Sequence, residues 1–266
     1  MREDDRYSRL IELLFKRKYK KGDTTVELRR DDFPDACREL GIPVPKNFGD
    51  VVYSFRYRKK LPDLINRAAP TGRTWIIMPA GMGIYRLEAV KNAELRPAVG
   101  RAVVKILDAT PGIIAGNAQS DEQGLLAKLR YNRLVDIFLG ITCYSLQNHL
   151  RTTVPDMGQI EVDEIYLGVD HRGAQYIIPV QAKGGTDHHS AVQIRQDIAM
   201  CEQRFAHLIC RPVGAQFIGE VIVLMEFTFQ AGEIAVRREQ HFQLVQADKL
   251  TDKELEAYRR AALADG

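Results

Sequence analysis

Hydrophobic positions at the start of the chain recur at the spacing of helices, with one short alternating segment between them. Apolar residues three and four apart predict a helix over residues 7–18. Its apolar face consists of Leu10, Ile11, Leu13, Leu14 and Phe15. A short strand is expected at 24–28, and Asp31 or Asp32 caps a second helix that ends near Gly41. The chain therefore opens with two short helices and a strand between them.

A third helix and a hairpin follow after a stiff segment. Prolines prevent a helix at 42–45, and the next helical pattern lies within 48–66. Strand-forming residues at 74–78 and 84–87, joined by a turn at 79–83, predict a β-hairpin. Short helices followed by a hairpin are the order of a winged helix-turn-helix, in which one helix enters the major groove and basic residues contact phosphates. The candidate contacts are Arg56, Arg58, Lys59 and Lys60. A solvated basic helix on any small α+β domain is the alternative reading.

Helical and strand patterns alternate in the second part of the chain. A capping box at Ser120 and Gln123 opens a helix that runs to about Phe138 and stops at Gly140. Thr251 opens the last helix in the same way. Between them we expect strands at 142–150, 159–169, 175–182, 221–229 and 241–245, and a helix at 191–208. This order predicts an α/β fold, with a mixed β-sheet flanked by helices.

Prolines and glycines between residues 89 and 118 indicate a connector and divide the chain. The expected domains are 1–100, which is winged-helix-like, and 101–266, which holds the sheet. Residues 1–100 contain 21 Lys and Arg against 14 Asp and Glu, whereas the remainder contains 17 against 21. A basic domain beside a mildly acidic one favours a polyanion-binding module joined to a module with its own carboxylates.

Composition excludes several classes of protein. A chain of 266 residues with 45% hydrophobic residues fits one large or two small globular domains. No apolar run approaches the roughly 18 residues that span a membrane, and the charged start is not a signal peptide, so a cytoplasmic protein is expected. Four cysteines without a CxxC pair predict buried, reduced thiols and neither a zinc site nor a disulfide framework.

The candidate chemistry lies between residues 158 and 185, which form two predicted strands joined by a turn. Side chains alternate across a strand, so Glu161 and Asp163 share one face of the first strand. Gln181 and Lys183 share one face of the second. If the two faces coincide, two carboxylates, an amide oxygen and an ammonium converge. Otherwise these are ordinary charged residues that face solvent.

Such a group suits the hydrolysis of a phosphodiester. Hard oxygen ligands bind Mg²⁺, which keeps several of its own waters. The metal ion polarises a phosphoryl oxygen and lowers the pKa of a bound water. The Lys183 ammonium can orient the attacking water and add positive charge beside the phosphorus.

Asp163 followed by Val180-Gln181-Ala182-Lys183 resembles the motif of the PD-(D/E)xK nuclease superfamily. The glutamine version is similar to that of its Mrr-type branch, and the resemblance covers roughly residues 120–230. It implies a mixed sheet flanked by helices and a requirement for Mg²⁺. Many members are type II restriction endonucleases that act as homodimers. Val162 stands where the superfamily usually has a proline.

The resemblance also implies a role for each matching residue. Asp163 would be the central metal ligand, Gln181 the second ligand and Lys183 the catalytic lysine. Many members use an acidic residue from the preceding helix, and Glu122 matches that place. Because Gln181 replaces a carboxylate, one anionic ligand is lost, and Glu161 is expected to compensate as a further metal ligand.

His149 and Arg151 alternate on the strand that precedes Asp163. Their side chains either contact a DNA phosphate beside the site or lie on an ordinary surface, and the sequence leaves both open. Gln193 and Gln196, on the helix that follows Lys183, could contact the nucleic acid or the site, but an ordinary helix surface is expected for both.

Together these features predict a Mg²⁺-dependent endonuclease for double-stranded DNA, most simply a type II restriction endonuclease. Cutting both strands with one site per chain calls for a homodimer, and a cognate methyltransferase would be encoded separately. Two alternatives on the same fold remain open at this stage, beside a metal-free scaffold protein in which the motif spacing arises by chance. One is a structure-specific repair or recombination nuclease. The other is a catalytically inactive DNA-binding protein on a nuclease fold, an alternative that the glutamine at position 181 keeps open.

Overall fold

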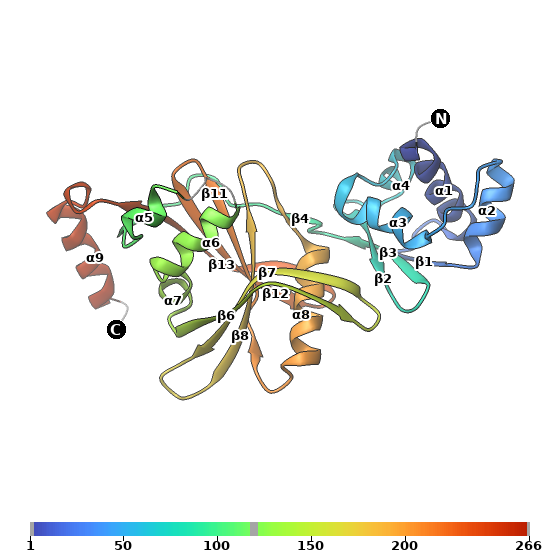
Figure 1. Ribbon diagram of the computed structural model, residues 1–266. Helices are drawn as coiled ribbons and strands as arrows, with labels where there is room; N and C mark the ends of the chain where they lie inside the picture. The colour runs from blue at the N-terminus through green and yellow to red at the C-terminus, as the bar shows by residue number, and fades with distance from the viewer. Residues whose placement is uncertain (1–2, 118–121, 265–266) are drawn as a thin grey trace.

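The computed structural model describes residues 3–117 and 122–264. Small helices gather around a three-stranded sheet at one end, and a large sheet with helices on both sides fills the middle (Figure 1). The C-terminal helix lies at the opposite end from the N-terminus. No helix in the described ranges is long and apolar enough to cross a membrane.

The first part is built on a small antiparallel sheet with strand order β1-β3-β2. Its elements are α1 (Glu3–Lys18), β1 (Thr25–Arg29), α2 (Asp32–Leu40), α3 (Phe48–Tyr53), the π-helical turn η1 (Ser54–Arg58), α4 (Asp63–Arg67), β2 (Thr74–Pro79) and β3 (Ile84–Val90). Leu10, Phe33, Ile65 and Trp75 belong to one buried apolar cluster that joins these helices to the sheet. The helix, strand and hairpin expected here are confirmed.

The third helix of this part is not continuous, which corrects the expectation for residues 48–66. Lys59 is extended, with φ −148° and ψ 154°, and ends η1. Pro62 then precedes α4. A proline lacks the N–H that a helix interior needs and disfavours helical backbone in the residue before it, so the chain breaks here.

The second part contains a mixed eight-stranded sheet with the path β5-β13-β12-β11-β8-β7-β6, and β10 pairs with β8 beside it. Its strands are β5 (Val103–Leu107), β6 (Thr142–Val154), β7 (Gly158–Val169), β8 (Gln175–Lys183), β10 (Ile209–Cys210), β11 (Val213–Ile218), β12 (Val221–Gln230) and β13 (Glu233–Val245). The short strands β4 (Glu94–Leu95) and β9 (His189–Ser190) pair with each other. Because β7 is antiparallel to β8 and β8 is parallel to β11, the sheet is mixed.

Helices cover both faces of this sheet. Helices α6 (Glu122–Tyr131) and α7 (Leu134–Leu139) pack on one face and α8 (Ala191–Arg204) packs on the other. The remaining helical elements of the described chain, α5 (Gly112–Ala115), the 3-10 turn η2 (Ala247–Lys249) and α9 (Asp252–Ala264), contribute no buried residue. Val180 of β8 belongs to the buried cluster of α6 and α7, whereas Ile177 belongs to the cluster of α8. Residues at odd separation on a strand face opposite sides, so the sheet lies between these helices. The expected mixed sheet flanked by helices is thus present.

Two features of the second part differ from the sequence expectation. The helix expected to run to Phe138 breaks at Arg133, which adopts a left-handed backbone with φ 52°. Ile137 of α7, the second of these helices, is 49% exposed. Strand β11 was not expected, because Gly214 interrupts its apolar pattern. The capping box at Ser120 lies outside the described residues, whereas Thr251 and Glu254 form theirs.

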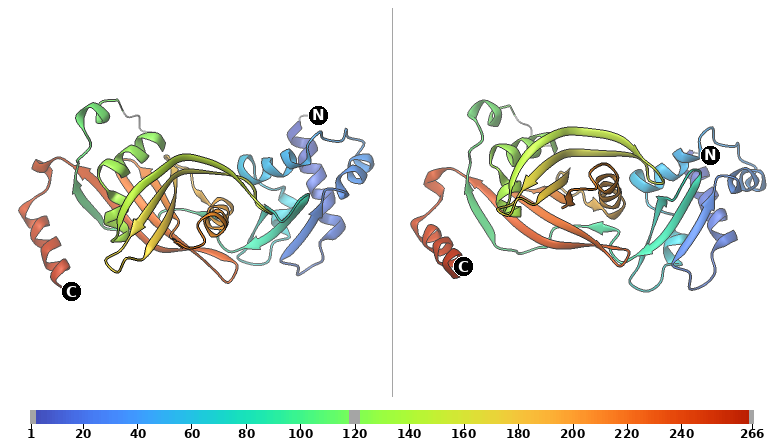
Figure 2. Two further views of the ribbon diagram at one scale, coloured as in Figure 1. Left: turned by 60° about the horizontal axis from the view of Figure 1, so that its bottom comes forward. Right: turned by 90° about the horizontal axis from the view of Figure 1, so that it is seen from below.

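Strands β6 and β7 form a long hairpin that arches over α8 (Figure 2). The first part of the chain contacts the same helix from another side. Val192 of α8 packs against Ile76, Met78 and Val90 of the small sheet, and Arg195 forms an ion pair with Glu88 at 2.5 Å. Helix α8 therefore lies between the small domain-like part, the arch and the large sheet.

The thiols lie as expected for reduced cysteines. All four are free, with Cys37, Cys143 and Cys201 buried and Cys210 half-buried.

Candidate active site

The ends of β7 and β8 bring the predicted catalytic residues together. Glu164 pairs with Val180 in the antiparallel register, so Asp163 lies beside Gln181. The Ala182 N–H, between Gln181 and Lys183, donates a hydrogen bond of 2.8 Å to Asp163 Oδ2. The two strand faces that the sequence indicated therefore coincide at this point.

Glu122 completes this group from a separate element. It lies in the first turn of α6, and its Oε1 is 3.3 Å from Lys183 Nζ. The Lys183 side chain is 17% exposed and that of Glu122 is 42% exposed. The pair is therefore open to solvent on the glutamate side, where a substrate can approach.

Burial raises the pKa of Asp163 above its ordinary value, because a charged carboxylate loses hydration in this position. The Ala182 N–H, Lys183 and His149 oppose this shift, and the nearby Glu161 carboxylate adds to it. Such a balance of burial and neighbouring charge is typical of functional sites.

Gln181 is held by an interaction that the sequence did not indicate. Its Nε2 donates to Asp197 Oδ2 at 3.0 Å, to Asp197 Oδ1 at 3.2 Å and to the Glu161 backbone carbonyl at 3.0 Å. Asp197 lies on α8 and is 1% exposed. Burial raises its pKa well above the ordinary range, and the negative charge of Asp163 adds to that shift. The sequence contained one signal for this residue, because Asp197 falls at a position that the helical pattern of 191–208 predicts to be buried.

Glu161, predicted as a metal ligand, lies on the exposed side of β7. Its carboxylate forms an ion pair with Arg151 at 3.0 Å on the neighbouring strand. His149 lies between Asn148 and Leu150, whose partners are Glu164 and Val162, so it is opposite Asp163. Its backbone is left-handed, with φ 48°. His149 and Arg151 are both exposed beside the site. Contact with a DNA phosphate stays a prediction for both.

The donor atoms at the site are oxygens of the kind that Mg²⁺ prefers. Asp163 uses Oδ2 for its hydrogen bond to Ala182, which leaves Oδ1 for another partner. Within the described residues no group of three or more His, Cys, Asp or Glu side chains could hold a metal ion. Mg²⁺ commonly binds one or two carboxylates together with waters and substrate phosphate. Asp163, Gln181 and the adjacent Glu122 fit that pattern.

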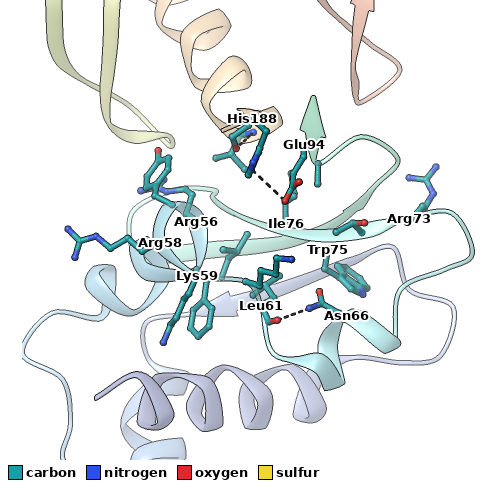
Figure 3. Close-up of a pocket in the computed structure, with 18 residues that line it drawn as sticks. Arg56, Arg58, Lys59, Leu61, Asn66, Arg73, Trp75, Ile76, Glu94 and His188 are labelled. Carbon is teal, nitrogen blue, oxygen red and sulfur yellow. Dashed lines mark hydrogen bonds and ion pairs between the residues drawn. The ribbon is translucent and has the colours of Figure 1, made fainter. Parts of the chain in front are cut away.

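The four predicted phosphate contacts lie on or just after η1, beside a cavity of about 530 Å³ (Figure 3). His188 of the second part and Glu94 of the connector form its opposite wall. Arg58 and Lys60 are exposed, whereas Arg56 and Lys59 are half-buried. The Arg56 guanidinium lies 4.7 Å from the Tyr57 ring, and Lys59 Nζ lies 4.4 Å from the Phe55 ring.

A smaller cavity of about 290 Å³ lies between this basic turn and Asp197, the hydrogen-bond partner of Gln181. It is lined by Tyr53, Arg56, Tyr57, Arg151, Gln159, Ile160, Glu161, Gln193, Gln196 and Asp197. The Tyr57 hydroxyl donates a hydrogen bond to Gln196 Oε1, and Gln196 Nε2 donates to the Met157 carbonyl at 3.0 Å. Gln196 is 1% exposed, so the expectation of a helix-surface residue was wrong there. The residue was missed because its partner belongs to another part of the chain.

His189 is another buried polar residue of the second part. It packs against Phe227 and beside Gly214, where a Cβ would meet His189 Cε1 at 2.8 Å. Neither ring nitrogen has a hydrogen-bond partner in the described part of the chain. Burial lowers the pKa of His189 to about 3, and the charge of Lys183 contributes. The imidazole is therefore neutral at physiological pH.

Comparison with known proteins gives no relative from which a function could be carried over. No protein-family model matches the chain, and neither a curated protein nor a solved structure matches it. The function is therefore inferred from the side chains described above.

Proposed function

We propose that this protein is a Mg²⁺-dependent endonuclease that hydrolyses double-stranded DNA. The observation that carries the proposal is the convergence of Asp163, Gln181 and Lys183 from two adjacent strands with Glu122 from the helix before them. These are the residues and elements that the resemblance to the PD-(D/E)xK superfamily implies. The mixed sheet with helices on both faces also agrees with that resemblance.

Each residue has a role that follows from its position. Asp163 Oδ1, Gln181 Oε1 and the Glu122 carboxylate would hold the metal ion. Mg²⁺, when bound, supplies Lewis-acid stabilisation of the charge that develops on the phosphate. Lys183 Nζ orients the attacking water and adds positive charge beside the phosphorus. Glu122 lies 3.3 Å from that ammonium and keeps it directed toward the open side.

The first part of the chain supports double-stranded DNA as the substrate. Its order of helices followed by the β2–β3 hairpin is that of a winged helix, and Arg58 and Lys60 are exposed at the end of its third helical segment. Phosphate contacts from such residues position a duplex without reading its sequence. A cavity extends from Arg56 on this surface to Asp197, which is hydrogen-bonded to Gln181 of the candidate active site.

One site per chain can cut only one strand at a time. We therefore propose a homodimer in which a two-fold axis matches a palindromic target, as for a type II restriction endonuclease. A separately encoded methyltransferase would then protect the host DNA.

The test is incubation of the purified protein with plasmid DNA, with Mg²⁺ and separately with EDTA. We expect Mg²⁺-dependent discrete fragments, and Asp163→Asn should lower the rate by on the order of 10³-fold while DNA binding persists. Lys253→Ala, at an exposed position on α9, is the matched control and should cut at the wild-type rate. Nicking or preference for branched DNA would indicate a structure-specific nuclease. DNA that shifts but is never cut would contradict the proposal.

A further inference from the structure

We infer that Asp197 is a positioning residue that orients the Gln181 amide, so that Gln181 Oε1 faces the metal ion and Nε2 faces away from it. This inference rests on the proposed function, because it concerns the ligand at position 181 of the same site. It explains how a glutamine serves where the superfamily motif commonly has a carboxylate.

The hydrogen-bond partners around Gln181 determine the orientation of its side-chain amide. Nε2 is surrounded by three acceptor oxygens, two from Asp197 and one from the Glu161 backbone, at 3.0 to 3.2 Å. An amide nitrogen carries two donor hydrogens, whereas the amide oxygen carries none. Turning the amide over would bring Oε1 against three acceptors without a hydrogen atom between them. The environment therefore holds Nε2 against α8 and the β7 backbone.

The opposite end of the amide is left available. Gln181 Oε1 accepts no hydrogen bond from the described residues, and it is not among the buried side-chain atoms that lack a partner. The oxygen therefore meets accessible space, although the residue as a whole is only 3% exposed. Asp163 and Lys183 lie beside it, so this space is the candidate metal site.

Among the described residues, the Gln181 amide is the hydrogen-bond partner of the buried Asp197 carboxylate. In the described part of the chain no Lys, Arg or His forms an ion pair with it, and its hydrogen bonds go to Gln181 Nε2. By contrast, the buried Glu164 is paired with Arg130 and Ser145, and the buried Glu226 with Arg211. A buried carboxylate that is held by a single amide is costly to the fold, so its position points to a role in the site.

The test exchanges the amide of position 181 and the carboxylate of position 197, which this hydrogen bond joins. Asp197→Asn offers donors to position 181, so Gln181 can turn its oxygen inward and lose it as a ligand. Gln181→Glu alone sets two carboxylates against each other in a buried place. The double variant Gln181→Glu with Asp197→Asn restores a donor on α8 and an acceptor at position 181, with an oxygen directed to the metal site.

Mg²⁺ binding is measured by titration calorimetry without DNA, and cleavage is measured separately. Loss of an outer partner of a metal ligand typically costs about 10- to 100-fold in affinity or activity. We expect Asp197→Asn to weaken Mg²⁺ binding and cleavage by that amount, and the double variant to recover to within about threefold of wild type. Glu226→Gln, a buried carboxylate away from the site, should lower stability and leave Mg²⁺ affinity unchanged.

Thermal unfolding of each variant identifies any that fails to fold, and the double variant then decides the matter, since it keeps the hydrogen bond. Asp197→Asn with wild-type Mg²⁺ affinity, or a folded double variant no better than either single one, would overturn the inference. Wild-type protein that neither binds Mg²⁺ nor cuts DNA would overturn the proposed function as well. Cleavage that depends on Asp163 but not on Asp197 would overturn only the inference.

Discussion

The two parts of this chain differ in where their charged side chains lie. The first part has an apolar core in which Leu10, Phe33 and Trp75 are buried, and its ion pairs, such as Arg17 with Glu39, lie at the surface. The second part buries charged and polar side chains, among them Glu164, Asp197, Glu226, His189 and Gln181. Surface pairs contribute little to stability, whereas buried charges are costly unless they are matched.

The buried charges of the second part themselves fall into two kinds. Glu164 is matched by Arg130 at 3.0 Å, and Glu226 by Arg211 at 2.8 Å, so these pairs hold elements of the fold together. Asp197 and Asp163 have hydrogen bonds to amide groups but no ion pair within the described residues. A buried carboxylate that is paired with an arginine thus indicates a structural role. A buried carboxylate without such a cation indicates a site that another charged species can complete. The predictions below test this division.

The largest effect is expected at Lys183, the cation nearest the incompletely matched carboxylates. Lys183→Ala should lower the cleavage rate by on the order of 10³-fold, because positive charge near the developing phosphate charge is removed. Affinity for DNA should change by less than about threefold, since duplex binding depends mainly on other phosphate contacts. Single-turnover cleavage and gel-shift titration measure the two quantities. Equal losses in both would mean that Lys183 binds DNA and has no part in the chemistry.

A large loss of stability without a change in the site is expected when a matched pair is broken. Arg130→Met leaves the fully buried Glu164 carboxylate without its cation, which should cost about 3 kcal/mol in the free energy of unfolding. Mg²⁺ affinity of the folded protein should stay at the wild-type value. Urea unfolding measures the loss, and Arg130→Met with Glu164→Met should recover part of it. A variant that kept full stability but lost Mg²⁺ binding would place this pair in the site.

The sequence predicted the apolar framework better than the charged interior. The helical spacing of Leu10 to Phe15 and the strand-forming run at 74–78 are local patterns, which a single sequence contains. The same alternation put Asp163 beside Gln181 and Lys183, because a tight turn joins β7 to β8 and fixes their register.

What the sequence did not indicate depends on contacts between distant segments. Asp197 is hydrogen-bonded to Gln181, 16 residues away along the chain. Gln196 is hydrogen-bonded to Tyr57, 139 residues away. No spacing along the sequence predicts either hydrogen bond, because the helix, the strand and the π-helical turn that supply these residues meet only after folding. Strand β11 was missed for a similar reason, since its pairing with β8 compensates for the weak strand pattern around Gly214.

The buried His189 predicts how the stability of the second part depends on pH. Its pKa is lowered to about 3 by burial, whereas the unfolded chain has an ordinary histidine pKa of roughly 6.5. The unfolded state therefore binds the proton first, and the stability from the neutral imidazole is lost as pH falls below about 6.5. Between pH 7 and 5 this amounts to about 2 kcal/mol. His189→Phe should remove that part of the pH dependence, measured by urea unfolding at both pH values.

The matched control for His189 is the exposed His171→Phe, which should leave the pH dependence of stability unchanged. An unchanged slope in His189→Phe would mean that the buried imidazole meets a partner when it is protonated. It would then belong with the matched charges of the second part.

The smallest effect is expected at the surface charges of the first part. Arg58→Ala and Lys60→Ala each remove an exposed cation that we propose contacts a DNA phosphate. Each should weaken DNA binding severalfold and reduce the dependence of log affinity on log salt concentration by about one. The rate of cleavage in the saturated complex should not change, since neither side chain lies at Asp163 or Lys183. Fluorescence anisotropy over a range of salt concentrations, with cleavage at saturating enzyme, measures both quantities.

Lys21→Ala is the matched control, because Lys21 is also exposed in the basic first part but lies in the turn after α1. If all three variants reduce the salt dependence equally, the first part attracts DNA by its total charge and the end of η1 is not a specific contact. If Arg58→Ala and Lys60→Ala leave binding unchanged while Arg151→Ala weakens it, the duplex is held by the β6–β7 arch instead. The division between a DNA-reading first part and a catalytic second part would then be wrong, because one surface would carry both tasks.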